Sequence, residues 1–179
     1  MDEELLSRQL PQSLEAEQAV LGSILIDSRC ITDVVGIVKP EDFYLQQNRE
    51  IFEAIYTMFN FSQTIDPVTV LDKLKELGYY HDNSRDYILQ LMEITPTAAN
   101  VVRYANIVRD KAMLRELNQA ATDIHEMVSE EVGTPAEMLE SAEKKIYALR
   151  KGERGDSLEH IGTTLHKVFD RLTELAQSD

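Results

Sequence analysis

The chain has 179 residues, 43% of them hydrophobic, which is enough for one folded domain with an extension. Its formal net charge is −14, and residues 1–100 alone carry 17 acidic and 7 basic side chains. A field of this sign repels phosphate, so we expect no direct binding of nucleic acid or of an anionic membrane. A basic or apolar protein partner fits the charge better.

Cysteine usage and the first residues indicate a reducing compartment. The lone Cys30 cannot form a disulfide within the chain, and we expect it to act as a small buried hydrophobe. The acidic start Met1–Glu4 lacks the basic region and the apolar run of a signal peptide. No stretch approaches 18 apolar residues, so we expect no membrane span and a cytoplasmic location.

The first predicted helix begins after Ser13, which can act as its N-cap. Glu15 and Glu17 then lie in the first turn, where the helix dipole favours negative charge. Gly22 falls inside the apolar pattern of this helix, where glycine costs stability relative to alanine. We therefore expect another helix to pack closely against Gly22.

Four more helices are predicted before residue 96. A short helix over 31–38 leads to a turn in which Phe43 fills the core. Asn48 caps the next helix, and Asp66–Pro67 starts another that Gly78 stops. The last of the four has apolar residues at helical spacing: Tyr87, Ile88, Leu91 and Met92. We find no alternating run typical of a strand.

The stretch from Pro96 to about Glu131 reads as one long helix of roughly 50 Å, capped by Thr95 or Thr97 and ended by Gly133. Thr134–Pro135 then starts a second helix, and so short a turn predicts an antiparallel hairpin. Apolar residues spaced by three and four form a seam on both helices: Leu114, Leu117, Ala121, Ile124 and Val128, then Leu139, Ala142, Ile146 and Leu149.

The predicted fold is therefore all-α. A small multi-helix globule covers 1–95, a long antiparallel helical hairpin covers 96–151, and a linker with an amphipathic helix covers 152–179. That last helix has an apolar stripe suited to docking on another chain or domain. Its candidate docking residues are Leu158, Ile161, Leu165, Val168, Phe169 and Leu172.

The sequence offers no catalytic constellation. None of the seven glycines begins a phosphate-binding loop of either common pattern, so we expect no nucleotide site. His125–Glu126 lacks the second histidine of a zinc-protease motif, because residue 129 is Ser129, and the other histidines are scattered. We expect no catalytic residue, no metal and no cofactor in this chain, and interpret it as an interaction and assembly module.

Four blocks in order resemble bacterial replicative DNA helicases of the DnaB type, over residues 5–176. The first is Pro11-Gln12-Ser13-Leu14-Glu15-Ala16-Glu17-Gln18-Ala19-Val20-Leu21-Gly22. The others are Phe43-Tyr44 with Asn48-Arg49-Glu50-Ile51-Phe52, Ile65-Asp66 with Thr69 and Leu74, and Pro96-Thr97-Ala98-Ala99-Asn100 with Tyr104-Ala105, Ile107-Val108 and Arg115-Glu116-Leu117. The family often has His where this chain has Asn48, and its loop differs from the segment Tyr80–Asp86.

The resemblance implies the N-terminal domain, hairpin and linker helix of such a helicase, ahead of an ATPase motor that would use ATP and magnesium. It implies that hairpins pair and build a hexameric collar, a trimer of dimers. It also implies binding of the primase C-terminal domain, a helicase loader, and the neighbouring subunit's motor domain through the linker helix.

Residues for these roles are expected from the resemblance and the apolar pattern. We expect the apolar seam of the hairpin to mediate dimerisation; the alternative is that this seam is the hairpin's own core. Its residues are Leu114, Leu117, Ala121, Ile124, Leu139, Ala142 and Ile146. We expect primase to bind at Tyr87, Asn118 and Ile124. The alternative for Tyr87 is that its ring simply packs in the core. Two other functions stay open: a motor-less adaptor or regulator of the helicase, and a small helical enzyme with an unrecognised site.

Overall fold

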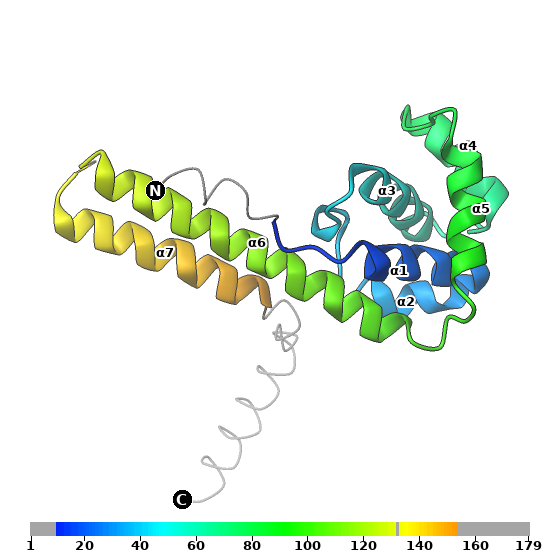
Figure 1. The fold of residues 1–179 in the computed structure, drawn as a ribbon, viewed down its shortest axis with the longest axis horizontal. Helices are drawn as coiled ribbons and strands as arrows, with labels where there is room; N and C mark the ends of the chain where they lie inside the picture. The colour runs from blue at the N-terminus through cyan, green and yellow to red at the C-terminus, as the bar shows by residue number, and fades with distance from the viewer. Residues whose placement is uncertain (1–9, 132, 154–179) are drawn as a thin grey trace, which may run out of the picture. The chain divides into compact units, whose positions relative to one another are not determined.

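A computed structural model describes residues 10–131 and 133–153, and every regular element in these ranges is helical, which confirms the all-α prediction (Figure 1). The helices are α1 (Leu14–Ile26), α2 (Ile31–Val34), α3 (Gln46–Asn60), α4 (Pro67–Leu77), α5 (Ser84–Ile94), α6 (Val101–Ser129) and α7 (Pro135–Glu153), with short 3-10 turns at Ser28–Cys30 and Pro40–Asp42.

The chain forms two compact units that divide inside α6, between Asn118 and Gln119. The sequence placed the end of the globule at residue 95. The structure extends the first unit into α6 because Val101, Ala105 and Val108 belong to the same buried core as α1 and α3. Apolar surface on the N-terminal part of α6 is therefore buried by the globule.

In the first unit, α1 packs against α5 and α3 packs against α4. Phe43 is fully buried, as predicted, and its ring stacks on Phe52 at 4.7 Å between centroids. The predicted close approach at Gly22 is confirmed, since an added β-carbon would lie 2.3 Å from the backbone oxygen of Leu91. Gly22 thus permits α1 and α5 to cross with their backbones nearly touching.

Local capping signals predicted helix ends well. The Asp66 carboxylate accepts from the backbone N–H of Val68 and Thr69, at 2.8 and 3.0 Å, and Pro67 occupies the first helical position. Gly78 ends α4 in the left-handed conformation, with φ of 78°. These two predictions are confirmed because both signals act through neighbouring backbone alone.

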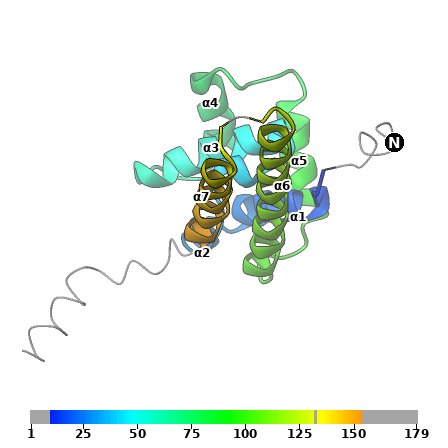
Figure 2. The same ribbon diagram turned by 90° about the vertical axis from the view of Figure 1, so that its left-hand side faces the viewer.

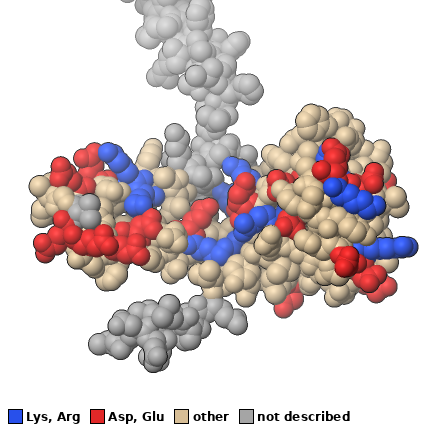
Figure 3. Space-filling model, turned by 90° about the horizontal axis from the view of Figure 1, so that it is seen from above, with Lys and Arg blue, Asp and Glu red and all other residues tan. Residues whose placement is uncertain are grey.

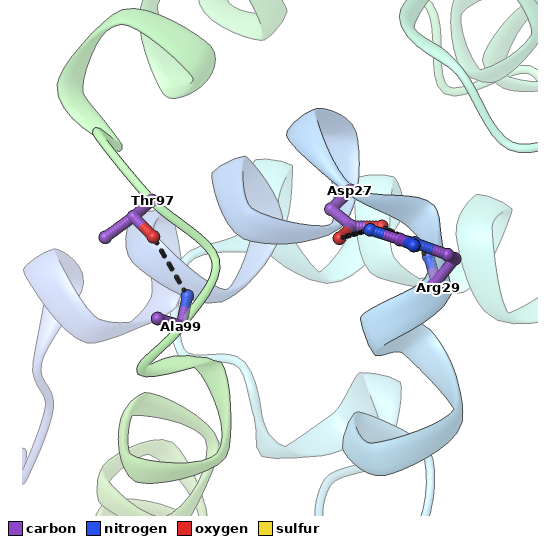
Figure 4. Close-up of polar contacts among 4 residues, drawn as sticks. All are labelled: Asp27, Arg29, Thr97 and Ala99. Carbon is purple, nitrogen blue, oxygen red and sulfur yellow. Dashed lines mark hydrogen bonds and ion pairs between the residues drawn. The ribbon is translucent and has the colours of Figure 1, made fainter.

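Three expectations were wrong at helix ends. Asn48 does not cap α3, which begins at Gln46, and its side chain is buried inside the unit instead. The long helix begins at Val101 rather than near Pro96, because Thr97 Oγ1 accepts from the Ala99 N–H and holds a turn before the helix (Figure 4). The helix predicted over 31–38 ends at Val34 and continues as a turn.

The loop after α1 is closed by a short ion pair. The Asp27 carboxylate accepts from the Arg29 guanidinium at 2.7 and 2.8 Å and from the Arg29 backbone N–H at 3.1 Å (Figure 4). The side-chain hydrogen bond from Arg29 lowers the pKa of Asp27 to about 2. This carboxylate is therefore ionised at neutral and mildly acidic pH.

Two arginines of α6 hold the loops of the first unit. Arg109 Nη1 donates to the backbone oxygen of Ile37 at 2.9 Å. Arg115 donates from Nη1 to the Pro11 oxygen at 2.9 Å and from Nη2 to the Asp42 oxygen at 2.5 Å. Charged donors on carbonyls make stronger hydrogen bonds than neutral ones. Two segments far apart in the sequence, around Pro11 and from Ile37 to Asp42, are thereby tied to one helix.

Candidate interaction surfaces

The described part of the second unit forms an antiparallel helical hairpin, as the sequence predicted. Figures 1 and 2 show α7 running beside the C-terminal part of α6 in the opposite direction. Lys145 Nζ lies 2.6 Å from Asp123 Oδ2 and joins the two helices. The hydrogen bond from Lys145 is the largest cause that lowers the pKa of Asp123.

A capping box starts α7, as expected from Thr134–Pro135. The Glu137 carboxylate accepts from the backbone N–H and the hydroxyl of Thr134, both at 2.8 Å. The Glu137 N–H is 3.4 Å from Thr134 Oγ1. The backbone hydrogen bond from Thr134 lowers the pKa of Glu137, so the box is complete while this carboxylate is ionised.

The face of α7 that packs within the hairpin is identified by its half-buried side chains, Met138, Ala142, Lys145 and Leu149. The ion pair from Lys145 to Asp123 shows that this face is turned toward α6. Leu139 and Ile146 lie about a quarter of a turn away from it at 100° per residue. They are 63% and 43% exposed. The hairpin's own packing thus leaves them on the surface.

The same separation holds on α6. Ala120 is buried and Ile124 and Met127 are half-buried, whereas Ala121 and Val128 are exposed. In the first unit, Leu114 and Leu117 are both 46% exposed. Most of the predicted seam therefore does not serve as the hairpin's internal core; only Ile124 and Ala142 of the seven predicted dimerisation residues are half-buried.

Acidic side chains surround the loop of the hairpin. Figure 3 shows them gathered at that end, and the exposed members are Glu126, Glu130, Glu131 and Glu137. On α7, Ile146 and Tyr147 line an open hollow of about 640 Å³. Tyr147 is 63% exposed. The hairpin therefore combines exposed apolar side chains with negative charge, which disfavours contact with phosphate.

Tyr87 lies half-buried on α5 and belongs to a polar network in the first unit. Its hydroxyl donates to Asn48 Oδ1 at 2.6 Å and accepts from Gln18 Nε2 at 3.3 Å. Burial raises the pKa of Tyr87, so its hydroxyl stays protonated and can donate. Of the other two residues predicted to bind primase, Asn118 is exposed, and Ile124 is half-buried in the second unit.

The network ends on a buried carboxylate that sequence reasoning assigned only to the helix dipole. Glu17 is 1% exposed and accepts from the backbone N–H of Tyr44 at 2.7 Å and of Leu45 at 3.3 Å. Asn48 Nδ2 donates to the same carboxylate at 2.8 Å. Three donors from the chain itself thus satisfy the buried Glu17 carboxylate.

A signal for this network was present in the sequence. Glu17 is three, four and seven residues before Val20, Leu21 and Ile24, which are all core residues. Asn48 stands at the same spacing before three further core residues, Ile51, Phe52 and Ile55. A polar residue in register with a buried apolar stripe indicates a satisfied buried group.

Neither a metal cluster nor a membrane-spanning helix is found in the residues that the structure describes. No group of three or more His, Cys, Asp or Glu side chains is placed to hold a metal ion in those residues. Burial raises the pKa of the half-buried Cys30 to about 11, so its thiol is a poor nucleophile. None of the described helices is both long and apolar enough to cross a bilayer. The predicted docking residues Leu158 to Leu172 lie outside the described residues.

Comparison with known proteins now decides the family. The family model "DnaB-like helicase N terminal domain" matches residues 9–110. The chain belongs to this family. Its sequence is 35% identical over 140 residues to the replicative DNA helicase DnaB of Leifsonia xyli, covering 78% of this chain and 31% of that protein. It is 32% identical over 183 residues to DnaB of Geobacillus stearothermophilus, covering 98% of this chain and 39% of that protein.

Solved structures agree with the DnaB-type fold. The N-terminal domain of Mycobacterium tuberculosis DnaB matches with a TM-score of 0.73 and 35% identity, over 79% of this chain and 99% of that chain. The Helicobacter pylori DnaB N-terminal domain, described with its interactions with primase, matches with a TM-score of 0.56 at 22% identity, over 72% of this chain and 99% of that one, and supports the fold alone. The chain spans only about a third of the length of its curated DnaB relatives.

Proposed function

We propose that this chain is the collar part of a replicative DNA helicase, in which the hairpins of neighbouring copies pair and lead from dimer to hexamer. The observation that carries the proposal is the exposure of large apolar side chains on both hairpin helices. Leu139 and Ile146 on α7, and Val128 on α6, are 63%, 43% and 54% exposed. Such side chains are favoured at protein–protein contacts and disfavoured as an open surface.

Helicase activity is proposed for a longer protein. Relatives bear the name replicative DNA helicase, and this chain corresponds to 31–39% of their length. We propose that ATP, magnesium and the catalytic residues belong to a motor domain outside this chain. The net charge of −14 supports a collar that leaves DNA contact to that motor. We propose a cytoplasmic location, as expected for a chain with a lone cysteine.

Primase is the second proposed partner. The H. pylori domain and another DnaB-like replicative helicase are each described with their interactions with primase. We propose that the primase C-terminal domain docks on the first unit, at Tyr87 and Asn118. The third residue expected from the resemblance, Ile124, belongs to the second unit. A half-buried aromatic ring held by hydrogen bonds suits an anchor, because little side-chain freedom remains to be lost on binding.

A helicase loader and the neighbouring motor domain complete the proposed partners. The segment that would reach the motor, with Leu158, Ile161, Leu165, Val168, Phe169 and Leu172, lies outside the described residues. Its apolar spacing of three and four supports a docked amphipathic helix. No residue is assigned to the loader.

The test is the mass of the chain in solution by light scattering, alone and with the primase C-terminal domain. We expect a dimer or hexamer that gains mass when primase is added. Leu139→Ser and Ile146→Ser together should lower the mass toward a monomer while leaving the helix content unchanged. Ala148→Ser, another exposed position on α7, is the matched control and should keep the wild-type mass. A wild-type monomer at high concentration that ignores primase would contradict the proposal.

A further inference from the structure

The hydrogen bonds that link Glu17, Asn48 and Tyr87 can run in only one donor-to-acceptor direction. The Glu17 carboxylate can only accept, so the Asn48 amide must turn its NH₂ group toward Glu17. The Asn48 oxygen then faces Tyr87, whose hydroxyl must donate to it. Gln18 donates to the same hydroxyl from α1. The orientation of each polar group is therefore fixed by the next one.

The network also joins interior to surface. Glu17 and Asn48 are buried at 1% and 0% exposure, whereas Tyr87 is half-buried. These residues come from α1, α3 and α5 in turn. The position of the Tyr87 ring is consequently set by two helices other than its own. A substitution of the buried Asn48 therefore affects the partly exposed Tyr87 side chain directly, through the 2.6 Å hydrogen bond between them.

We propose that Asn48 is a positioning residue for the partner that docks on Tyr87: it holds the phenol in its binding orientation without touching the partner. The inference rests on the proposed function, in which that partner is the primase C-terminal domain. Without the hydrogen bond from Tyr87 to Asn48, the ring regains rotational freedom that binding must remove. Immobilising one such side chain corresponds to about a two- to ten-fold loss of affinity.

The experiment measures the Kd for the primase C-terminal domain by calorimetry with the full chain. Asn48→Leu removes the buried acceptor, and Tyr87→Phe removes the donor but keeps the ring. Each single variant should weaken binding about five-fold, and the double variant should be no weaker than the worse single variant, because both cut one link. Tyr80→Phe, at another partly exposed tyrosine, is the control and should bind as wild type.

Asn48→His adds a rescue. A neutral imidazole has one donor for Glu17 and one acceptor for Tyr87, so this variant should bind within two-fold of wild type at pH 8. If Asn48→Leu does not fold, judged by its circular dichroism, the inference is still overturned by Tyr87→Phe binding like wild type or by Asn48→His failing to keep wild-type affinity, because neither variant removes the donor to Glu17.

Three results would overturn the inference. Single variants that bind like wild type would show that the network does not set affinity. Losses that multiply in the double variant would mean that the Tyr87 hydroxyl contacts primase directly and that Asn48 acts separately. Absence of primase binding by the wild-type chain would overturn the proposed primase site together with this inference, whereas the first two results leave that site intact.

Discussion

Gly22 on α1 lies so close to Thr95, at the end of α5, that an added β-carbon would be 2.1 Å from the Thr95 hydroxyl oxygen. The same carbon would be 2.3 Å from the Leu91 backbone oxygen, which no side-chain rotation can relieve. Glycine is thus required here by space, although it is a poor helix former. The two helices cross at this point in the core of the first unit.

Gly22→Ala should therefore lower the free energy of unfolding by at least about 2 kcal/mol, because α1 and α5 must separate to admit the methyl group. Urea unfolding followed by circular dichroism measures the change. Gly36→Ala is the matched control, since nothing lies within 4 Å of a β-carbon at Gly36. That variant should stay within about 0.5 kcal/mol of wild type. Equal stability of the two variants would contradict the close crossing.

Glu17→Ala should cost about 2–4 kcal/mol of unfolding free energy, because the N–H groups of Tyr44 and Leu45 and the Asn48 amide would lose their common acceptor. Glu15 stands in the same turn but is exposed. Glu15→Ala should cost only a few tenths of a kcal/mol, from the lost interaction with the helix dipole. Chemical denaturation distinguishes the two, and similar losses would show that the Glu17 carboxylate is dispensable.

Cys30 should react slowly with thiol reagents in the folded protein. Burial raises the pKa of its thiol from 9.0 to about 11, so the folded chain disfavours the thiolate. Any effect of this thiol on stability is therefore absent well below pH 9 and becomes destabilising as the pH rises above 9, because the unfolded chain then favours the thiolate. Alkylation at pH 8 should be slower than for a free cysteine and should accelerate in urea. An unchanged rate on unfolding would contradict a protected thiol.

The Asp123–Lys145 ion pair should stabilise the hairpin only while Asp123 is ionised. The pKa of Asp123 is lowered from 3.8 in the folded chain, so its contribution is present above about pH 4 and is lost as the pH falls below that value. Asp123→Asn should melt below wild type at pH 7, and the difference should shrink toward pH 3. Asp110→Asn, at an exposed aspartate of the same helix, serves as the control. A pH-independent difference would mean that the lost contact is not ionic.

Elements specified by neighbouring residues could be predicted, and those specified by distant ones could not. Asp66–Pro67, Gly78 and Thr134–Pro135 fix helix ends through backbone within one turn, and the structure has them there. Asn48 was predicted to cap α3 because asparagine is a common N-cap residue. Instead, its side-chain amide donates a hydrogen bond to the Glu17 carboxylate on α1. Capping preference was overridden by the need to satisfy a buried charge.

The hairpin shows a similar limit. Spacing by three and four identified the apolar positions of α7, but it does not state which edge of a broad stripe faces the neighbouring helix. The long side chain of Lys145 reaches Asp123, which centres the packed face on Met138, Ala142 and Leu149 and leaves Leu139 and Ile146 exposed. Only the packing of the folded helices distinguishes the internal face from the exposed one.

Near the end of the first unit, the Arg115 guanidinium on α6 donates hydrogen bonds to the backbone oxygens of Pro11 and Asp42. Beyond Asn118 the helix no longer belongs to that unit. If both hairpin helices became longer or shorter by the same number of turns, the hydrogen bonds of Arg109 and Arg115 to the loops would therefore stay unchanged. The hairpin can therefore change in length among relatives without a change in the sequence of the first unit. We expect insertions in related proteins to occur after the position of residue 118 more often than before it.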